Sequence, residues 1–161
     1  MTLLICENKD IWFNIRRLMA EESCYEFLGV HIDGVIYGQG NDVTGKGKFS
    51  SYARFLNTGK LSFLYCGDID RAGFDIFFRL CKEAAELDIV LFVPIYKKML
   101  ELADVSLLPE SDDKRGKDIE TDSLRELFSE EEIDKINDVL SADKRLPQEI
   151  INYEVLKNNS R

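Results

Sequence analysis

The apolar residues of the first hundred positions fall into two patterns that alternate along the chain. Short, nearly continuous apolar runs are typical of strands buried on both faces, and apolar residues three and four apart are typical of amphipathic helices. The apolar runs predict strands at Leu3–Cys6, Gly34–Tyr37, Leu61–Tyr65 and Ile89–Val93. The helical pattern predicts helices at Asp10–Glu22, Phe49–Leu56, Ala72–Leu87 and Tyr96–Ala103. Strands that alternate with helices predict an α/β fold, with a mostly parallel four-stranded sheet and helices on both faces.

The last third of the chain has a different character. Residues 109–122 are polar and predict a loop. Helical patterns follow at Asp122–Phe128, Glu130–Leu140 and Pro147–Leu156. Ser129 and Glu132 have the spacing of a capping box at the start of the middle helix. We therefore expect an α/β domain at 1–108 and an acidic helical C-terminal extension at 109–161 that packs on it.

The composition of the chain bears on whether it binds nucleic acid without a partner. The 161 residues are 45% hydrophobic and 32% charged, which is typical of a globular protein with a core. The net charge of −9, from 21 basic and 30 acidic residues, argues against a self-sufficient nucleic-acid binder. Residues 101–161 hold 9 of the basic and 17 of the acidic side chains, so the acidity belongs to the extension. Nucleic-acid contact by the first hundred residues is not excluded.

Cysteine and histidine content argues against two other classes. The four cysteines have no CxxC spacing and His31 is the single histidine, so neither a structural zinc site nor a disulfide framework is expected. The first residues lack the pattern of a signal peptide, and no apolar run has membrane-spanning length. These features predict a cytoplasmic protein without a membrane partner.

Acidic side chains follow two of the predicted strands. Glu7 ends the first strand, and Asp68 and Asp70 follow the third within a segment that Gly67 and Gly73 flank. In open α/β sheets, ligands bind beyond the carboxyl ends of the strands. If the two strands are close, three carboxylates converge there and repel one another unless a divalent cation binds. The pattern predicts a Mg²⁺ site, with Mn²⁺ as an alternative, suited to phosphodiester chemistry.

A simpler interpretation exists for each of these acids. Asp70 stands just before a strongly predicted helix and suits an N-cap. Glu7 alone would be an ordinary surface residue. A DxD spacing by itself is weak, and only the combination at two strand ends favours a site.

The same combination resembles a known family. A strand that ends in Glu-Asn and another that ends in Gly-Asp-x-Asp-x-x-Gly resemble the Toprim domain of topoisomerases, primases and several nucleases. The closer resemblance is to the C-terminal domain of JetD, the nuclease subunit of Wadjet plasmid-defence systems, itself similar to the Toprim part of type IIB topoisomerase A subunits. The resemblance rests on residues 6–9, 65–73 and 145–149, which together span most of the chain.

The resemblance implies roles for particular residues. Glu7 would be the catalytic glutamate, and Asp68 and Asp70 would hold Mg²⁺, with all three forming the catalytic and metal-binding set. Glu149 would add a carboxylate for a second metal or beside the first, although an exposed acid in the first turn of a helix explains it as well. Residues 1–108 would then be a Toprim-like, Rossmann-like catalytic domain.

Basic residues follow the second predicted strand. Lys46, Lys48 and Arg54 lie in a window without any acid, and together with glycine amides they would hold DNA phosphate. Arg71 lies directly after Asp70 and would either contact DNA or balance the acids. A solvated loop is the simpler interpretation of this window.

These expectations lead to one main function and two rivals. The main one is a Mg²⁺-dependent DNA endonuclease domain of a plasmid-defence or topoisomerase-like system. Its DNA-binding domain would be supplied by a missing N-terminal part or by partner subunits of an SMC-like complex, and a homodimer is left open. One rival is a non-catalytic metal-binding module that docks into a larger DNA-processing complex. The other is a phosphotransfer receiver domain, which the Glu7-Asn8 pair disfavours, since receivers have an acidic pair at that place.

Overall fold

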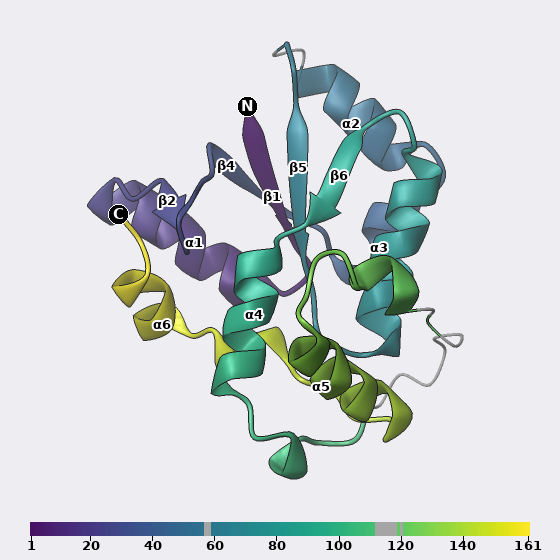
Figure 1. Cartoon of the computed structure of the whole chain (residues 1–161). Coiled ribbons are helices and arrows are strands. Elements are labelled where there is room, and N and C mark those ends of the chain that lie inside the picture. Colours follow the sequence, from purple (N-terminus) through teal and green to yellow (C-terminus); the bar gives the residue numbers. More distant parts are fainter. Residues whose placement is uncertain (57–58, 112–118, 120) are drawn as a thin grey trace.

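A parallel four-stranded sheet forms the centre of the molecule, in the order β4-β1-β5-β6 (Figure 1). The computed structural model describes residues 1–56, 59–111, 119 and 121–161. The strands are β1 (Thr2–Cys6), β4 (Gly34–Tyr37), β5 (Ser62–Cys66) and β6 (Asp88–Leu91). This confirms the predicted α/β class and places the first and third predicted strands side by side.

Burial explains why the strands have such different sequences. In the central strands, Leu4, Ile5, Phe63 and Tyr65 are fully buried, because helices cover both faces of the sheet there. The continuous apolar runs are the expected consequence. The edge strand β6 alternates exposed and buried residues, so only one of its faces lies against the core.

The crossover connections place helices on both faces. The helices that follow the strands are α1 (Lys9–Glu22), α2 (Lys48–Leu56), α3 (Arg71–Glu83) and α4 (Val93–Leu102). The step from β1 to β4 runs in the opposite direction to the steps from β4 to β5 and from β5 to β6. Because such crossovers are right-handed, α1 covers one face of the sheet, and α2 and α3 cover the other (Figure 1).

Three element boundaries in the α/β part differ from the sequence predictions by more than one residue. The third helix ends at Glu83 rather than Leu87. The fourth strand ends at Leu91, and Val93 already opens α4 with Pro94 in its first turn. Proline is accepted in a first turn because the N–H of that position has no partner within the helix, so Pro94 lies inside the start of α4 and the strand has already ended before it.

Short elements lie between these main ones. They comprise a hairpin of β2 (Glu26–Phe27) and β3 (Val30–His31), which the sequence analysis did not predict, and the 3₁₀ turns η1 (Gly40–Thr44) and η2 (Val105–Leu107). Two paired residues in each strand are too few to produce a recognisable period-two pattern. The predicted loop at 109–122 lies largely outside the described residues.

The C-terminal part consists of α5, α6 and two 3₁₀ turns, and one of its three predicted helices is confirmed. The elements are η3 (Thr121–Leu124), α5 (Glu130–Ser141), η4 (Gln148–Ile150) and α6 (Tyr153–Asn158). The capping box of Ser129 and Glu132 is formed with both of its hydrogen bonds. The helix predicted at Pro147–Leu156 is wrong as a single element, because Asn152 leaves helical geometry and caps α6 through its side chain. Only a 3₁₀ turn is present in the predicted helix at Asp122–Phe128.

The chain end returns to the first helix and to the loops beyond the strands. Helix α6 contacts α1, and Lys157 pairs with Glu22 at 2.7 Å. The Arg161 backbone bonds to Glu26 in both directions, at 3.0 and 2.9 Å. In Figure 1 the green and yellow C-terminal segments gather on the side where β5 and β6 end. Glu7, Asp68 and Asp70 lie on that same side, because they follow the ends of β1 and β5.

The described helices are all too short or too polar to cross a membrane.

Candidate metal and catalytic site

The register of the two central strands brings the two acidic motifs together. Cys6 of β1 pairs with Cys66 of β5, and the Glu7 N–H donates to the Cys66 carbonyl oxygen at 3.0 Å. Glu7 therefore lies beside Gly67 at the carboxyl edge of the sheet. A Cβ at Gly67 would collide with Glu7 Oε2, so glycine makes room for the carboxylate.

Glu7 is a partly buried carboxyl group held by a tyrosine. The Tyr65 hydroxyl donates to Glu7 Oε2 at 2.9 Å, and Tyr65 is fully buried in β5. Burial raises the pKa of Glu7 from 4.5 to about 7, the charges of Asp68 and Asp70 raise the pKa further, and the Tyr65 bond opposes the rise. Glu7 Oε1 has no hydrogen-bond donor within the described part of the chain. One oxygen is thus fixed while the other stays available.

Asp68 is held by the C-terminal segment. The backbone N–H of Gln148 donates to Asp68 Oδ1 at 2.9 Å, and the Gln148 side-chain amide adds a longer bond of 3.3 Å. Arg145 Nε lies 3.6 Å from Asp68 Oδ2. Burial raises the pKa of Asp68 from 3.8 to about 6, opposed first by the Gln148 N–H. The charges of Glu149 and Asp70 add to the rise in this pKa.

Asp70 has the structural role that the simpler interpretation assigned to it. It is the N-cap of α3, and its Oδ1 accepts the Gly73 N–H at 2.7 Å. Its Oδ2 accepts the Ser111 hydroxyl at 3.2 Å, and the residue is only 4% exposed. Its charge nevertheless acts on both Glu7 and Asp68, as their raised pKa values show. Each oxygen of Asp70 therefore already accepts one hydrogen bond, and Oδ2 keeps a second lone pair.

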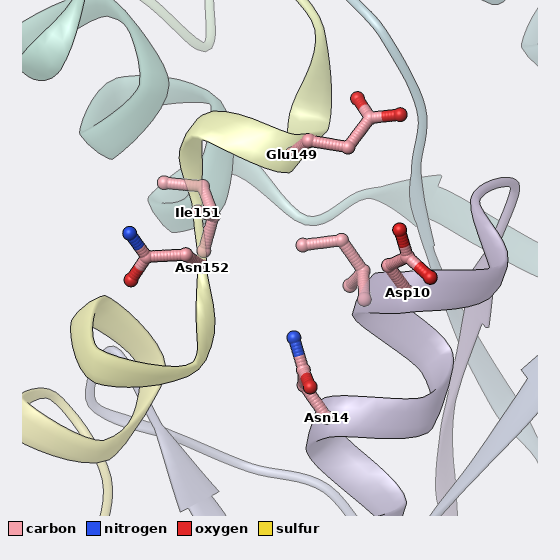
Figure 2. A pocket seen from close by; sticks show the side chains of 6 residues that line it. Asp10, Asn14, Glu149, Ile151 and Asn152 are labelled. Atoms are coloured by element: carbon pink, nitrogen blue, oxygen red, sulfur yellow. The ribbon is translucent and has the colours of Figure 1, made fainter.

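Glu149 approaches the same region from η4. The Asn8 side-chain amide donates to Glu149 Oε1 at 2.6 Å, and Asn8 Oδ1 caps the first turn of α1. Figure 2 shows Glu149 on its turn across from Asp10 and Asn14 of α1, at a cavity of about 230 Å³. Glu149 is exposed, and its charge raises the pKa of Asp68. Glu149 therefore lies near Asp68 but on the exposed side of the site, apart from the partly buried carboxyl groups of Glu7 and Asp68.

The donor set suits a cation that needs few protein ligands. Within the described ranges, no three Asp, Glu, His or Cys side chains lie close enough together to hold a metal ion as they stand. Mg²⁺ is usually bound through one or two carboxylates and keeps several waters. The partly buried pair of Glu7 and Asp68 fits that requirement, because both groups are oxygen donors, and burial together with the neighbouring carboxylates raises the pKa of each. A divalent cation would stabilise the charged form of both carboxylates.

The predicted basic residues do not all lie at this edge. Lys46 and Lys48 are exposed around the start of α2, and Lys48 lines a groove of about 560 Å³ together with Tyr37 and Gln39. Gly40, next to Gln39, lies 4.0 Å from Glu7 Oε1 when a Cβ is added, so this groove begins beside the site.

Arg54 and Arg71 have other surroundings. Arg54 lies at the end of α2 away from the site, where it donates to the Ser50 carbonyl oxygen and acts on Glu86. Arg71 Nε donates to the Leu140 carbonyl oxygen at 3.2 Å and lies 3.1 Å from Asp143, which ties the start of α3 to the end of α5.

Sequence reasoning did not identify three residues that shape the site. Tyr65 was part of a strand pattern, and its hydroxyl gives no sign in the sequence of reaching Glu7. Arg145 and Gln148 contact Asp68 across about eighty positions of chain, a contact that spacing cannot reveal. The one available signal was that both belong to the segment 145–149, which carries part of the family resemblance.

Comparison with known proteins supports the resemblance and adds no close relative. No curated protein matches the sequence. The family described as "Wadjet protein JetD, C-terminal" matches residues 2–160, which is nearly the whole chain and includes Glu7, Asp68 and the segment that holds Asp68. The chain belongs to the family of C-terminal domains of the Wadjet protein JetD, and with it to the Wadjet plasmid-defence systems.

Proposed function

We propose that this domain cleaves DNA phosphodiester bonds with a divalent cation, Mg²⁺ or Mn²⁺, held by Glu7, Asp68 and Asp70. The observation that carries the proposal is the partly buried pair of carboxyl groups, Glu7 and Asp68, at the ends of two adjacent parallel strands. Both groups have raised pKa values, and perturbed acids at such an edge are typical of a functional site.

Each side chain at the site has its own role in the proposed cleavage. A bound divalent cation would polarise a phosphoryl oxygen and lower the pKa of the attacking water. Glu7 would accept the proton from that water. Tyr65 fixes Glu7 Oε2 and thereby orients Oε1. Gln148 fixes Asp68 Oδ1, and Oδ2, which lies 3.6 Å from Arg145 Nε, would bind the cation. Asp70 sets the conformation of the loop through its cap and would offer the second lone pair of Oδ2 to the cation.

DNA reaches the site from the side of α2 in this proposal. Lys46 and Lys48 are exposed next to the groove that begins beside Glu7, and they contact phosphates of the bound strand. Glu149 sits at the opposite rim, where it would serve a second cation. Arg71 contributes by holding α3 to α5, and Arg54 contacts DNA only outside the cleavage site.

Partners are part of the proposal because the chain is acidic. With a net charge of −9, the domain as a whole repels DNA electrostatically. We propose that other parts of JetD or further Wadjet subunits, including an SMC-like complex, deliver the DNA. A homodimer stays a prediction.

A second function, a non-catalytic metal-binding module, is favoured by one observation. Asp70 is engaged on both oxygens, and the described residues contain no ready group of three ligands. In that case Glu7 and Asp68 would bind a cation that fixes the loop for docking into the complex, and DNA would stay intact.

Plasmid cleavage decides between the two functions. Supercoiled plasmid is incubated in Mg²⁺, in Mn²⁺ and in EDTA, with the chain alone and with its Wadjet partner subunits. We expect nicked or linear DNA from the wild type, none in EDTA, and none from Glu7→Gln or Asp68→Asn. Glu126→Gln, which removes one exposed carboxylate elsewhere, serves as the matched control and keeps full activity. Binding of Mg²⁺ by calorimetry without cleavage in any mixture would support the docking module and overturn the nuclease.

A further inference from the structure

Arg145 enters the carboxylate site on the segment between α5 and η4. Leu146 forms an antiparallel bridge with Ile69, with backbone bonds of 3.0 and 3.1 Å, so this segment runs alongside the loop of Asp68 and Asp70. The Arg145 N–H also donates to the Pro109 carbonyl oxygen at 3.0 Å. The backbone of Arg145 is therefore fixed next to the proposed catalytic loop.

The guanidinium of Arg145 is left with unused donors. Its Nε is buried and has no hydrogen-bond partner among the described residues. The nearest acceptor, Asp68 Oδ2, lies 3.6 Å away, which is an ion-pair distance and too long for a good hydrogen bond. Buried polar groups are almost always paired, so a lone buried donor at a site calls for an explanation. The side chain as a whole is 38% exposed, so it reaches solvent beside the site.

Asp68 gives Arg145 an ion pair through Oδ2 but no hydrogen bond to its Nε. The other oxygen of Asp68, Oδ1, already accepts from the backbone and side chain of Gln148. The other nearby arginine, Arg71, is committed to Leu140 and Asp143. Arg145 is therefore a cation beside Glu7 and Asp68 whose buried Nε lacks a hydrogen-bond acceptor. Its planar guanidinium group has the geometry to bind a phosphate with two parallel hydrogen bonds.

We propose that Arg145 binds a phosphate group of the DNA strand at the carboxylate site. This inference rests on the proposed function, because it assumes that DNA is the ligand of that site. A phosphate oxygen would supply the acceptor that the guanidinium lacks. Arg145 would then hold the strand against Glu7 and Asp68 and oppose the repulsion between phosphate and these carboxylates.

The test measures DNA binding and needs no cleavage. All proteins carry Asp68→Asn, which removes the ion-pair partner of Arg145 and the expected cleavage together. A fluorescein-labelled DNA duplex is titrated in Mg²⁺ by fluorescence anisotropy at several salt concentrations. The variants added to this parent are Arg145→Gln, Arg145→Lys and Arg125→Gln. Arg125 is 57% exposed and pairs with Asp122 on the surface, so its variant controls for loss of one positive charge. Thermal melting verifies that each protein is folded.

The expected results separate a phosphate contact from a structural role. Arg145→Gln weakens binding about ten-fold, the effect of losing a charged hydrogen bond. It also lowers the slope of log affinity against log salt by about 0.9, the effect of losing one phosphate contact. Arg145→Lys keeps the salt slope and loses part of the affinity, and Arg125→Gln changes neither. The proposal is overturned if the parent does not bind the duplex, or if Arg145→Gln leaves affinity and slope unchanged.

The outcome is independent of the nuclease proposal. A wild type that binds DNA through Arg145 but never cuts it would retain this inference and remove the nuclease. A wild type that cuts DNA while Arg145→Gln binds normally would do the reverse.

Discussion

Replacing Glu7 by glutamine should stabilise the metal-free protein at alkaline pH. The folded-state pKa of Glu7 is raised from 4.5 to about 7 by burial, so the folded protein binds this proton more tightly than the unfolded chain. Stability therefore falls as the pH rises from about 4.5 to about 7, and the loss is complete above that range. Each pKa unit corresponds to about 1.4 kcal/mol, which gives a cost of about 3 kcal/mol at pH 8.

Glutamine has nearly the same shape and no charge, so it removes this cost. Its carbonyl oxygen can still accept the Tyr65 hydroxyl. We expect Glu7→Gln to be more stable than the wild type by about 3 kcal/mol at pH 8 and nearly equal to it at pH 4. Urea unfolding in EDTA at pH 4, 6 and 8 measures the difference, with Glu126→Gln as the control that should follow the wild type.

Adding Mg²⁺ should close most of this gap. An ion held by Glu7 stabilises the folded wild type by about 2.7 kcal/mol at a concentration one hundred times its dissociation constant. The glutamine variant should gain much less. The reasoning is refuted if Glu7→Gln is the less stable protein at pH 8 in EDTA, or if Mg²⁺ stabilises both proteins equally.

Three further substitutions test the surroundings of the site and of the C-terminal part. Tyr65→Phe removes the hydroxyl that holds Glu7, so the pKa of Glu7 should rise further; NMR titration of the carboxyl carbon measures it, and an unchanged value would contradict the contact. Gly67→Ala places a methyl group against Glu7 Oε2, which should abolish plasmid cleavage and cost about 1–3 kcal/mol in urea unfolding; full activity would show that the carboxylate is not confined there. Ser129→Ala breaks the capping box with Glu132 and should cost about 1 kcal/mol without affecting cleavage, and a stability equal to the wild type would place no weight on this cap.

The sequence predicted the parts of the fold that depend on local pattern. The four strands of the main sheet and the helices between them follow from apolar periodicity, because a strand buried on both faces must be apolar throughout. The proximity of Glu7 and Asp68 was predicted only on the condition that their strands were close. The structure meets this condition, since β1 and β5 are neighbours. Strand order is a property of the whole fold that no single segment encodes.

The parts of the fold that the sequence analysis missed depend on tertiary contacts or on the conformation of a single residue. The helix predicted at Pro147–Leu156 is divided by Asn152, whose side chain caps α6 instead of continuing the turn before it. Helical spacing is the same in both cases, so the pattern could not distinguish them. The contacts of Asp68 with Gln148 and Arg145 join distant segments, and they arise because the Leu146–Ile69 bridge brings the segment back.

At the site, the sequence identified candidate acidic and basic residues but could not show which contacts each of them makes. Asp70 suited both an N-cap and a metal ligand, and the structure shows the cap. Its place within the ligand set stays a prediction. The window from Lys46 to Arg54 looked uniform in sequence, yet its helical part carries Arg54 away from the carboxyl edge. A helix moves about 1.5 Å along its axis per residue, so a run of basic residues along it cannot all face one site.

Locating a bound cation tests the central claim most directly. A crystal of the chain soaked in Mn²⁺ gives an anomalous difference map in which the ion is identified without any assumption about activity. The account predicts a peak about 2 Å from carboxylate oxygens of both Glu7 and Asp68, with water completing the shell. A protein that binds Mn²⁺ only elsewhere, or shows no peak between these two carboxylates, would contradict it.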